Sequence, residues 1–419
     1  MSPLRLFLPA LFFSASGLAA NWPTWRGPQG DGTTTETNLP LQWSATENVK
    51  WKIDLPGPGN STPIIWGDRI FLTQAVGQRR TVMCLDRQDG KLLWQQGPTW
   101  SQPEQTHDTN PPCASSPITD GERVIAWFGS AGLYAYDFVG KELWHVDLGK
   151  QDHIWGYGSS PVLAGDLCFL NFGPGPRSFL VAVNKRTGQE VWRFDVPPPA
   201  TSEGPGSGQG YAGTWSTPVL AKLDGRDQLI VDMPGAVFGL DPATGKEIWH
   251  CNGLNPLSYA EPILVDGVIV GLGGYSGWAI GLKAGGSGDI TATNRLWQDK
   301  RTPQRIGSGV VVDGKIYLGS DSGFVQCIDP KTGTRLLDVR TPVTPAQKAS
   351  SWSSFVRSGD RLYLVTKSSD TLVFRADPKM ELLADNALED GRTNASLAVS
   401  NGELFIRTHA HLWCIAAAK

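Results

Sequence analysis

The sequence contains few charged residues, and neither the basic nor the acidic ones are clustered. Lysine, arginine, aspartate and glutamate make up 18% of its 419 residues, and the formal net charge is −3. A nucleic-acid-binding surface needs lysines and arginines gathered in one basic stripe, so this composition argues against DNA or RNA as a partner. No amphipathic helical period stands out either, which argues against a helical fold.

Long apolar runs are missing as well. Residues 1–20 combine Arg5, an apolar run over residues 6–13 and small residues over 14–20, the pattern of a secretory signal peptide cleaved near Ala20. That run is too short for a stable membrane-spanning helix, and no later segment is more apolar. We therefore expect an exported protein, periplasmic or extracellular, without a membrane span.

The usual catalytic motifs are also absent. The chain contains no G-x-S-x-G and no H-E-x-x-H in a suitable context, and the glycine-rich run 204–210 lacks the helix and lysine of a phosphate-binding loop. The composition and motifs thus point away from the common hydrolases, zinc proteases and nucleotide-binding enzymes.

The six cysteines follow no zinc-ligand spacing, and no two of them are adjacent. Cys84, Cys327 and Cys414 share one position of a repeat, where other copies carry alanine or glycine. A thiol there serves as a small apolar side chain, so we expect three buried free thiols. A disulfide between Cys113 and Cys251, which lie in connections, stays open as an alternative.

Turn residues and tryptophan are abundant, with 49 glycines, 30 prolines and 17 tryptophans. The stretch Ser216–Trp249 shows their arrangement: four short β-branched or aromatic runs separated by Gly, Pro, Asp and Thr, typical of four strands with tight turns. Its opening Ser-Ser/Thr-Pro, or a degraded form, recurs 42 to 57 residues apart, at Ser61, Ser115, Ser159, Ser216, Ala260, Gly307, Ser353 and Ala395.

A period of this length with four strands per unit predicts the blades of a β-propeller. The eighth unit ends after three strands, and residues 49–53 around Trp51 supply a fourth. We predict an all-β, eight-bladed propeller over 49–419, made of four-stranded antiparallel blades and closed by pairing the N-terminal strand with the last blade, which removes exposed sheet edges. Residues 21–48 form an irregular strap anchored by Trp22, Trp25 and Trp43.

The cluster Gly239–Trp249 (G-L-D-P-A-T-G-K-E-I-W), with weaker copies over 182–192 and 327–333, resembles the tryptophan-docking repeat of PQQ-like, quinoprotein-type propellers. The opening of the strap resembles exported PQQ-like repeat proteins of planctomycete-type bacteria. The resemblance implies that the tryptophans of the fourth strands pack between adjacent blades; these are Trp51, Trp94, Trp144, Trp192, Trp249 and Trp297.

The resembled family contains two functional classes. One is the pyrroloquinoline quinone (PQQ) dehydrogenases, in which the quinone lies on a vicinal disulfide and a tryptophan floor near Ca2+. The other is non-catalytic and includes a propeller lipoprotein that assists outer-membrane β-barrel assembly. Because this chain has no adjacent cysteine pair and no motif-level match to the Ca2+ ligands, we expect no cofactor and no metal, with PQQ and Ca2+ kept as an alternative.

The loops that enter the innermost strands should form a funnel at one end of the channel, where binding residues tend to lie. Glu261 replaces the second serine of the motif there; it would be a ligand contact or an acid/base group, or else an ion-pair partner of Arg305 or Arg392. His107 beside Asp108 could transfer protons or merely face solvent. The full candidate set is His107, Asn110, Trp155, Tyr157, Trp215, Tyr259, Glu261, Arg305, Trp352, Arg392 and Asn394.

The leading hypothesis is an exported, monomeric, non-catalytic propeller that binds a protein or glycan of the cell envelope through this funnel. Two alternatives stay open. One is a PQQ-dependent oxidoreductase, and the other is a carbohydrate-active enzyme centred on Glu261.

Overall fold

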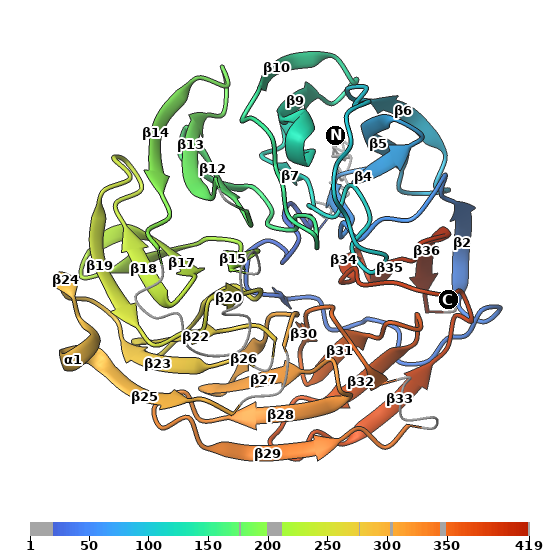
Figure 1. The fold of residues 1–419 in the computed structure, drawn as a ribbon. Coiled ribbons are helices and arrows are strands. Elements are labelled where there is room, and N and C mark those ends of the chain that lie inside the picture. The colour runs from blue at the N-terminus through green and yellow to red at the C-terminus, as the bar shows by residue number, and fades with distance from the viewer. Residues whose placement is uncertain are drawn as a thin grey trace, which may run out of the picture.

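The eight sequence repeats form eight sheets, which are arranged radially around one axis (Figure 1). The computed structural model describes residues 20–175, 177–198, 212–275, 277–301, 305–343 and 349–417. The predicted signal peptide, apart from Ala20, and the glycine-rich run 204–210 lie outside these residues. The prediction of an all-β, eight-bladed propeller is confirmed.

In blades 1 to 4 the strands follow one another from the axis to the rim and pair antiparallel. Their bounds are β3 (Ile64–Trp66), β4 (Arg69–Val76), β5 (Arg79–Asp86) and β6 (Leu92–Gln96); β7 (Ile118–Thr119), β8 (Arg123–Trp127), β9 (Leu133–Asp137) and β10 (Glu142–Val146); β11 (Val162–Ala164), β12 (Leu167–Phe172), β13 (Phe179–Asn184) and β14 (Glu190–Asp195); β16 (Val219–Leu223), β17 (Arg226–Met233), β18 (Ala236–Leu240) and β19 (Glu247–Asn252).

Blades 5 to 8 repeat this order, except that the last outer strand comes from the beginning of the chain. Their bounds are β21 (Ile263–Val265), β22 (Val268–Leu272), β23 (Ala279–Lys283) and β25 (Arg295–Asp299); β26 (Val310–Val312), β27 (Lys315–Gly319), β28 (Phe324–Ile328) and β29 (Arg335–Arg340); β30 (Val356–Ser358), β31 (Arg361–Val365), β32 (Thr371–Arg375) and β33 (Leu382–Asn386); β34 (Ala398–Ser400), β35 (Glu403–Arg407), β36 (His411–Ala416) and β2 (Val49–Asp54).

A few short elements lie outside the four-strand pattern. Strand β1 (Thr33–Thr34) adds to β30, β24 (Gly288–Asp289) adds to β19, and β15 (Gly213–Thr214) pairs with β20 (Leu257–Ser258), all in parallel. The described helices are the 3-10 turn η1 (Gly129–Ala131) and α1 (Thr291–Asn294). Across the described ranges, no helix has the length and apolar character needed to cross a bilayer.

The ring is closed by the two ends of the chain. Strand β2 pairs antiparallel with β36, with Trp51 opposite Cys414, and Figure 1 shows the blue strand beside the red one. The closure that the missing eighth strand predicted is therefore present. All six cysteines are buried and free, so the three expected thiols are confirmed and no bridge joins Cys113 to Cys251.

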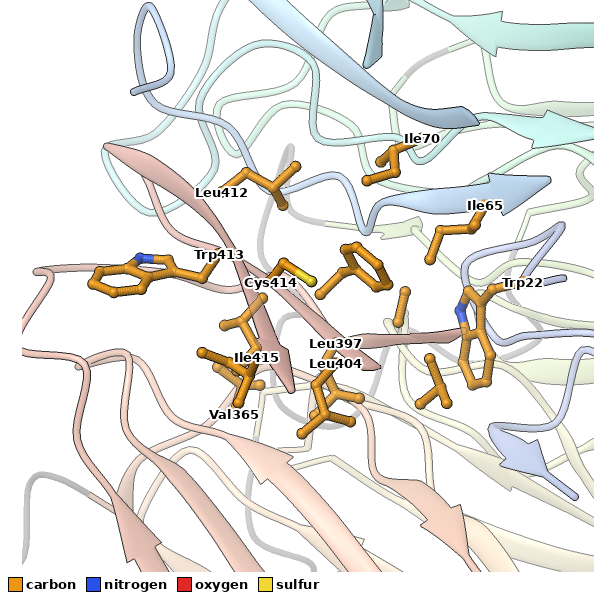
Figure 2. Close-up of a cluster of buried hydrophobic side chains, with 14 of the residues drawn as sticks. Trp22, Ile65, Ile70, Val365, Leu397, Leu404, Leu412, Trp413, Cys414 and Ile415 are labelled. Carbon is orange, nitrogen blue, oxygen red and sulfur yellow. The ribbon is translucent and has the colours of Figure 1, made fainter. Parts of the chain in front are cut away.

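Apolar side chains fill the spaces between neighbouring blades. In the cluster drawn in Figure 2, Leu404 and Cys414 of blade 8 lie among Ile70 of blade 1 and Trp22 of the strap, all less than 2% exposed. Because each sheet buries both faces against its neighbours, the second and third strands of the blades are almost continuously buried.

The outer-strand tryptophans reach from one blade to the next. The indole N–H of Trp94 donates to the carbonyl of Phe138 at 3.0 Å, and that of Trp192 donates to Pro242 at 2.9 Å. Equivalent bonds are made by Trp51 to Arg87, Trp144 to Lys185 and Trp297 to Pro330.

Trp249 differs from this pattern. Its indole N–H donates to Gln228 of its own blade at 2.7 Å. The next blade has a longer turn at this point, which returns as β24 and pairs alongside Trp249. The interblade bond made by the other five tryptophans is thus replaced at Trp249, where the turn of the next blade is longer.

A ring of hydroxyl groups encircles the axis at the start of the innermost strands. In each link the backbone N–H of one motif residue donates to the hydroxyl of the equivalent residue in the next blade, for example Thr62 to Ser116 at 2.8 Å and Ser396 back to Thr62 at 3.2 Å. The remaining links are Ser116 to Ser160, Ser160 to Thr217, Glu261 to Ser308, Ser308 to Ser354 and Ser354 to Ser396, at 2.9–3.1 Å. The acid Glu261 stands where the eighth hydroxyl would be.

The strap runs through the axis rather than over the surface. Trp22 exchanges backbone hydrogen bonds with Ile65 at 2.8 and 2.9 Å, and the N–H of Arg357 donates to Gly32 at 2.8 Å. Figure 1 shows the blue segment crossing the middle of the ring. Trp22 and Trp43 are buried anchors as expected, but Trp25 stays half-exposed on the axis.

We expect Ser116→Ala to lower the free energy of unfolding by about 1–3 kcal/mol, because it leaves the buried N–H of Thr62 without an acceptor. Urea denaturation followed by tryptophan fluorescence measures the change. Ser101→Ala, at an exposed serine, is the control and should change stability little. Equal effects of the two substitutions would show that the ring bond does not stabilise the fold.

Candidate functional site

A cavity of about 430 Å³ lies where the inner strands begin, on the axis of the propeller. Six of the ring hydroxyls face it, and aromatic side chains from the connecting loops and the strap enclose it. Its lining consists of Trp25, Asn60, Thr62, His107, Thr109, Asn110, Ala114, Ser116, Trp155, Gly158, Ser160, Trp215, Thr217, Tyr259, Tyr275, Ile306, Trp352, Ser354, Asn394 and Ser396. We call this cavity the funnel.

One side of the funnel is an aromatic wall, formed by three successive blade connections and one hairpin loop of blade 5. Trp155 and Tyr275 stack with ring centroids 6.0 Å apart and an angle of 20° between planes. Trp215 meets Tyr259 edge to face at 5.0 Å, and its indole N–H donates to the carbonyl of Gly156 at 3.1 Å. Burial raises the pKa of Tyr259, so its hydroxyl stays protonated.

The ring hydroxyls are polar groups of the funnel lining, and hydrogen bonds hold them in place. Each of the six in the lining uses its oxygen to accept a backbone N–H, as Ser160 does from Ser116 at 3.1 Å. A hydroxyl also carries one proton of its own. Within the described chain we find no acceptor for these six protons, so they are available to a ligand in the funnel.

Seven of the eleven residues proposed from the sequence line the funnel. Asn110 is held by the carbonyls of Trp155 and Tyr157, at 2.8 and 2.9 Å, and Asn394 donates to the carbonyl of Thr109 at 2.7 Å. The seven are His107, Asn110, Trp155, Trp215, Tyr259, Trp352 and Asn394.

The other four lie elsewhere. Tyr157 is buried, and its hydroxyl accepts the N–H of Cys113 at 3.2 Å. Arg305 is buried and donates to Gln326 at 2.9 Å. Arg392 lines a neighbouring cavity.

Glu261, the fourth, does not project into the channel mouth, so that expectation is wrong. Its carboxylate accepts the Nε of Arg26 at 2.7 Å, and neither side chain is more than 5% exposed. The partner is therefore neither Arg305 nor Arg392 but a strap residue. Burial raises the pKa of Glu261 to about 7, although the Arg26 charge offsets part of this effect.

Arg26 attaches the strap to three blades at once. Besides Glu261, its guanidinium donates to the carbonyls of Phe355, at 3.0 Å, and Gly309. The preceding residue, Trp25, lines the funnel. The strap thus lies across the axis, and this ion pair holds it one residue from Trp25.

Sequence reasoning missed the ring hydroxyls, Trp25 and Tyr275 as lining residues. The hydroxyls had a usable signal, because the second residue of the repeated motif is Ser or Thr in seven of its eight copies. Trp25 and Tyr275 had no comparable signal, since they come from an irregular strap and from a hairpin loop within one blade.

Comparisons with known proteins agree on the fold. A family model, PQQ_2, described as outer membrane protein assembly factor BamB, matches residues 33–173 and 176–419. Quinohemoprotein alcohol dehydrogenase ADH-IIG of Pseudomonas putida is 24% identical over 376 residues, 76% of this chain and 46% of that protein. Polyvinylalcohol dehydrogenase of Sphingopyxis sp. (strain 113P3) is 23% identical over 393 residues, 78% and 58% of the two chains. This chain thus spans about half the length of these curated relatives.

Two solved structures share the architecture at low identity. BamB from Moraxella catarrhalis superposes with a TM-score of 0.54 at 15% identity, covering 77% of this chain and 85% of that one. Quinohemoprotein alcohol dehydrogenase from Comamonas testosteroni gives a TM-score of 0.64 at 13% identity, covering 96% and 81%. These likenesses establish the propeller fold.

We expect Arg26→Met and Glu261→Ser to destabilise the protein by about 3–5 kcal/mol each, because each leaves a buried partner uncompensated. The double variant should lose clearly less than the sum of the two, since it removes both charges and restores a ring hydroxyl. Urea denaturation of all four proteins gives the coupling free energy. If the two losses of unfolding free energy are additive, the Arg26–Glu261 pair does not stabilise the strap.

Proposed function

The chain belongs to the PQQ_2 family, described as outer membrane protein assembly factor BamB. We propose that it is an exported, non-catalytic binding module whose funnel holds a saccharide. One observation carries the proposal. The funnel combines flat aromatic faces with hydroxyl groups in a single cavity.

This combination suits the chemistry of a sugar ring. The C–H faces of a pyranose pack against aromatic planes such as Trp155 and Trp215, while its oxygens accept hydrogen bonds from Ser116, Ser160 and Thr217. A volume of about 430 Å³ is within the range of small-ligand sites. A protein partner would instead need a broad face of roughly 800 Å².

The lining favours binding over glycoside hydrolysis. That reaction depends on a pair of carboxylic acids flanking the scissile bond, and no residue of the funnel lining is Asp or Glu. The imidazole Nδ1 of His107 is already bonded to the hydroxyl of Thr109 at 2.8 Å. Glu261, the acid of the enzyme alternative, is buried against Arg26.

The lining residues also do not fit PQQ with Ca2+. PQQ carries three carboxylates, and the cations that could balance them, Arg340, Lys367 and Arg392, lie outside the funnel in a neighbouring cavity. Calcium requires six to eight oxygen ligands, commonly including carboxylates, and no described group of three or more His, Cys, Asp or Glu residues could hold a metal. We therefore derive no oxidation step, although the names of the curated relatives make the oxidoreductase the alternative to test.

We expect Trp215→Ala to weaken saccharide binding about tenfold or more, because it removes one face of the aromatic wall. A glycan array identifies the ligand, and isothermal titration calorimetry measures the affinity. Trp100→Ala is the matched control, since Trp100 lies in the same connection as His107 but outside the lining. Equal losses in both variants would contradict a binding role for the wall.

The same preparation tests the alternative functions. If the glycan array shows no ligand and the protein captures an outer-membrane protein, the partner is a protein and not a saccharide. Reduction of a dye after addition of PQQ, Ca2+ and an alcohol would establish the oxidoreductase instead. Neither result is expected.

A further inference from the structure

A second cavity of about 780 Å³ adjoins the funnel. The two cavities lie side by side, because both are lined by Thr109 and Asn394. The side chains that line the second cavity are polar or charged. It is lined by Thr109, Asp321, Ser322, Arg340, Ser350, Lys367, Ser368, Gly391, Arg392, Thr393, Asn394 and His409.

Three cations from different segments converge on this cavity. Arg340 ends β29, Lys367 follows β31, and Arg392 lies in the connection to blade 8. Asp321 balances only Lys367, at 3.0 Å. Among the described residues, neither Arg340 nor Arg392 forms an ion pair with a carboxylate.

The two arginines are therefore available for an anion. Arg340 is positioned by the ring of Phe324, 4.6 Å from its guanidinium carbon, and donates one N–H to the carbonyl of Ser322 at 3.0 Å. No other described residue accepts a hydrogen bond from its guanidinium. Arg392 is exposed to the cavity, and its backbone carbonyl accepts the N–H of His409 at 2.9 Å.

The positive charge of nearby arginines affects the pKa of the neighbouring His409. Burial, together with the charges of Arg407 and Arg392, lowers the pKa of His409 to about 4. Its Nε2 lies 3.0 Å from the amide oxygen of Asn60, a residue of the funnel lining. His409 is therefore neutral at neutral pH and adds no cation of its own.

Trp352 connects the two cavities physically. It lines the funnel, and its indole N–H donates to the Asp321 carboxylate at 2.6 Å. Lys367 bonds the same carboxylate and lies 4.8 Å from the centre of the Trp352 ring. The charged pair thus fixes an aromatic side chain of the funnel.

We propose that the second cavity is an anion subsite and that the ligand is an acidic saccharide. On this reading, which rests on the function proposed above, one sugar ring lies in the funnel and a carboxylate or sulfate ester of an adjoining ring binds Arg340 and Arg392. Guanidinium groups recognise both anions through paired N–H donors. Because the whole chain has a net charge of −3, the attraction is local to this cavity.

The test measures affinities of the full mature chain for three oligosaccharides of equal length: a neutral one, a uronate and a sulfate ester. Isothermal titration calorimetry should show at least one acidic ligand binding about tenfold or more tightly than the neutral one. Arg340→Gln and Arg392→Gln should each remove about threefold of that preference, and the double variant should bind acidic and neutral ligands alike. Arg226→Gln, an exposed arginine of blade 4, is the charge-matched control and should change nothing.

The outcomes separate this inference from the function on which it rests. Neutral binding without an acidic preference overturns the anion subsite and leaves the saccharide function standing. Absence of binding to all three overturns both. Unchanged acidic preference in the double arginine variant would place the anion elsewhere and overturn the subsite.

The pKa of His409 gives a second readout that does not depend on affinity. Arg392→Gln should raise the pKa of His409 above about 4, because it removes one of the neighbouring positive charges. In the unsubstituted protein, a saturating acidic ligand should raise this pKa too, and the neutral ligand should raise it less. NMR titration of the imidazole resonances measures both; equal values with the two ligands would contradict an anion beside Arg392.

Discussion

The structure depends on a chain of hydrogen bonds that links the blades around its axis. A propeller blade contacts only its neighbours, so each blade has to be joined to the next one. The motif hydroxyls form seven of these links, because the backbone N–H at the start of an inner strand donates to the hydroxyl of the next blade, and Ser396 donates back to Thr62. At blade 5 the hydroxyl is replaced by Glu261, which pairs with Arg26 of the strap. Six of the same hydroxyls line the funnel, so one set of residues links the blades and lines the site.

The exception at Glu261 follows from the same constraint. An acid cannot sit among buried hydroxyls without a partner, since desolvation of a lone carboxylate is costly. Arg26 meets this need and also brings Trp25 under the ligand cavity. A departure from the repeat in blade 5 is thereby explained by a residue 235 positions earlier in the chain.

The sequence was sufficient for the blades and their closure, because strand periodicity, turn residues and the position of Trp51 are local signals that recur in register. It also identified seven funnel residues, since loops before the motif must converge on the axis. It could not place the strap, which has no period, or find the Arg26 partner of Glu261, which depends on three-dimensional contact. Arg305 and Tyr157 were misplaced because loop position alone does not tell whether a side chain turns to the channel or into the blade interface.

The position of the strap also implies an order in which the contacts of the fold form. Its contacts span the chain, from Ile65 in blade 1 to Phe355 in blade 7, while β2 must wait for β36 at the opposite end. Contacts between such distant segments are slow to form, because a long loop must close before they contribute. The contacts of the strap with Phe355 and of β2 with β36 therefore form late in folding, and the axial cavity is complete only when the last blades are in place.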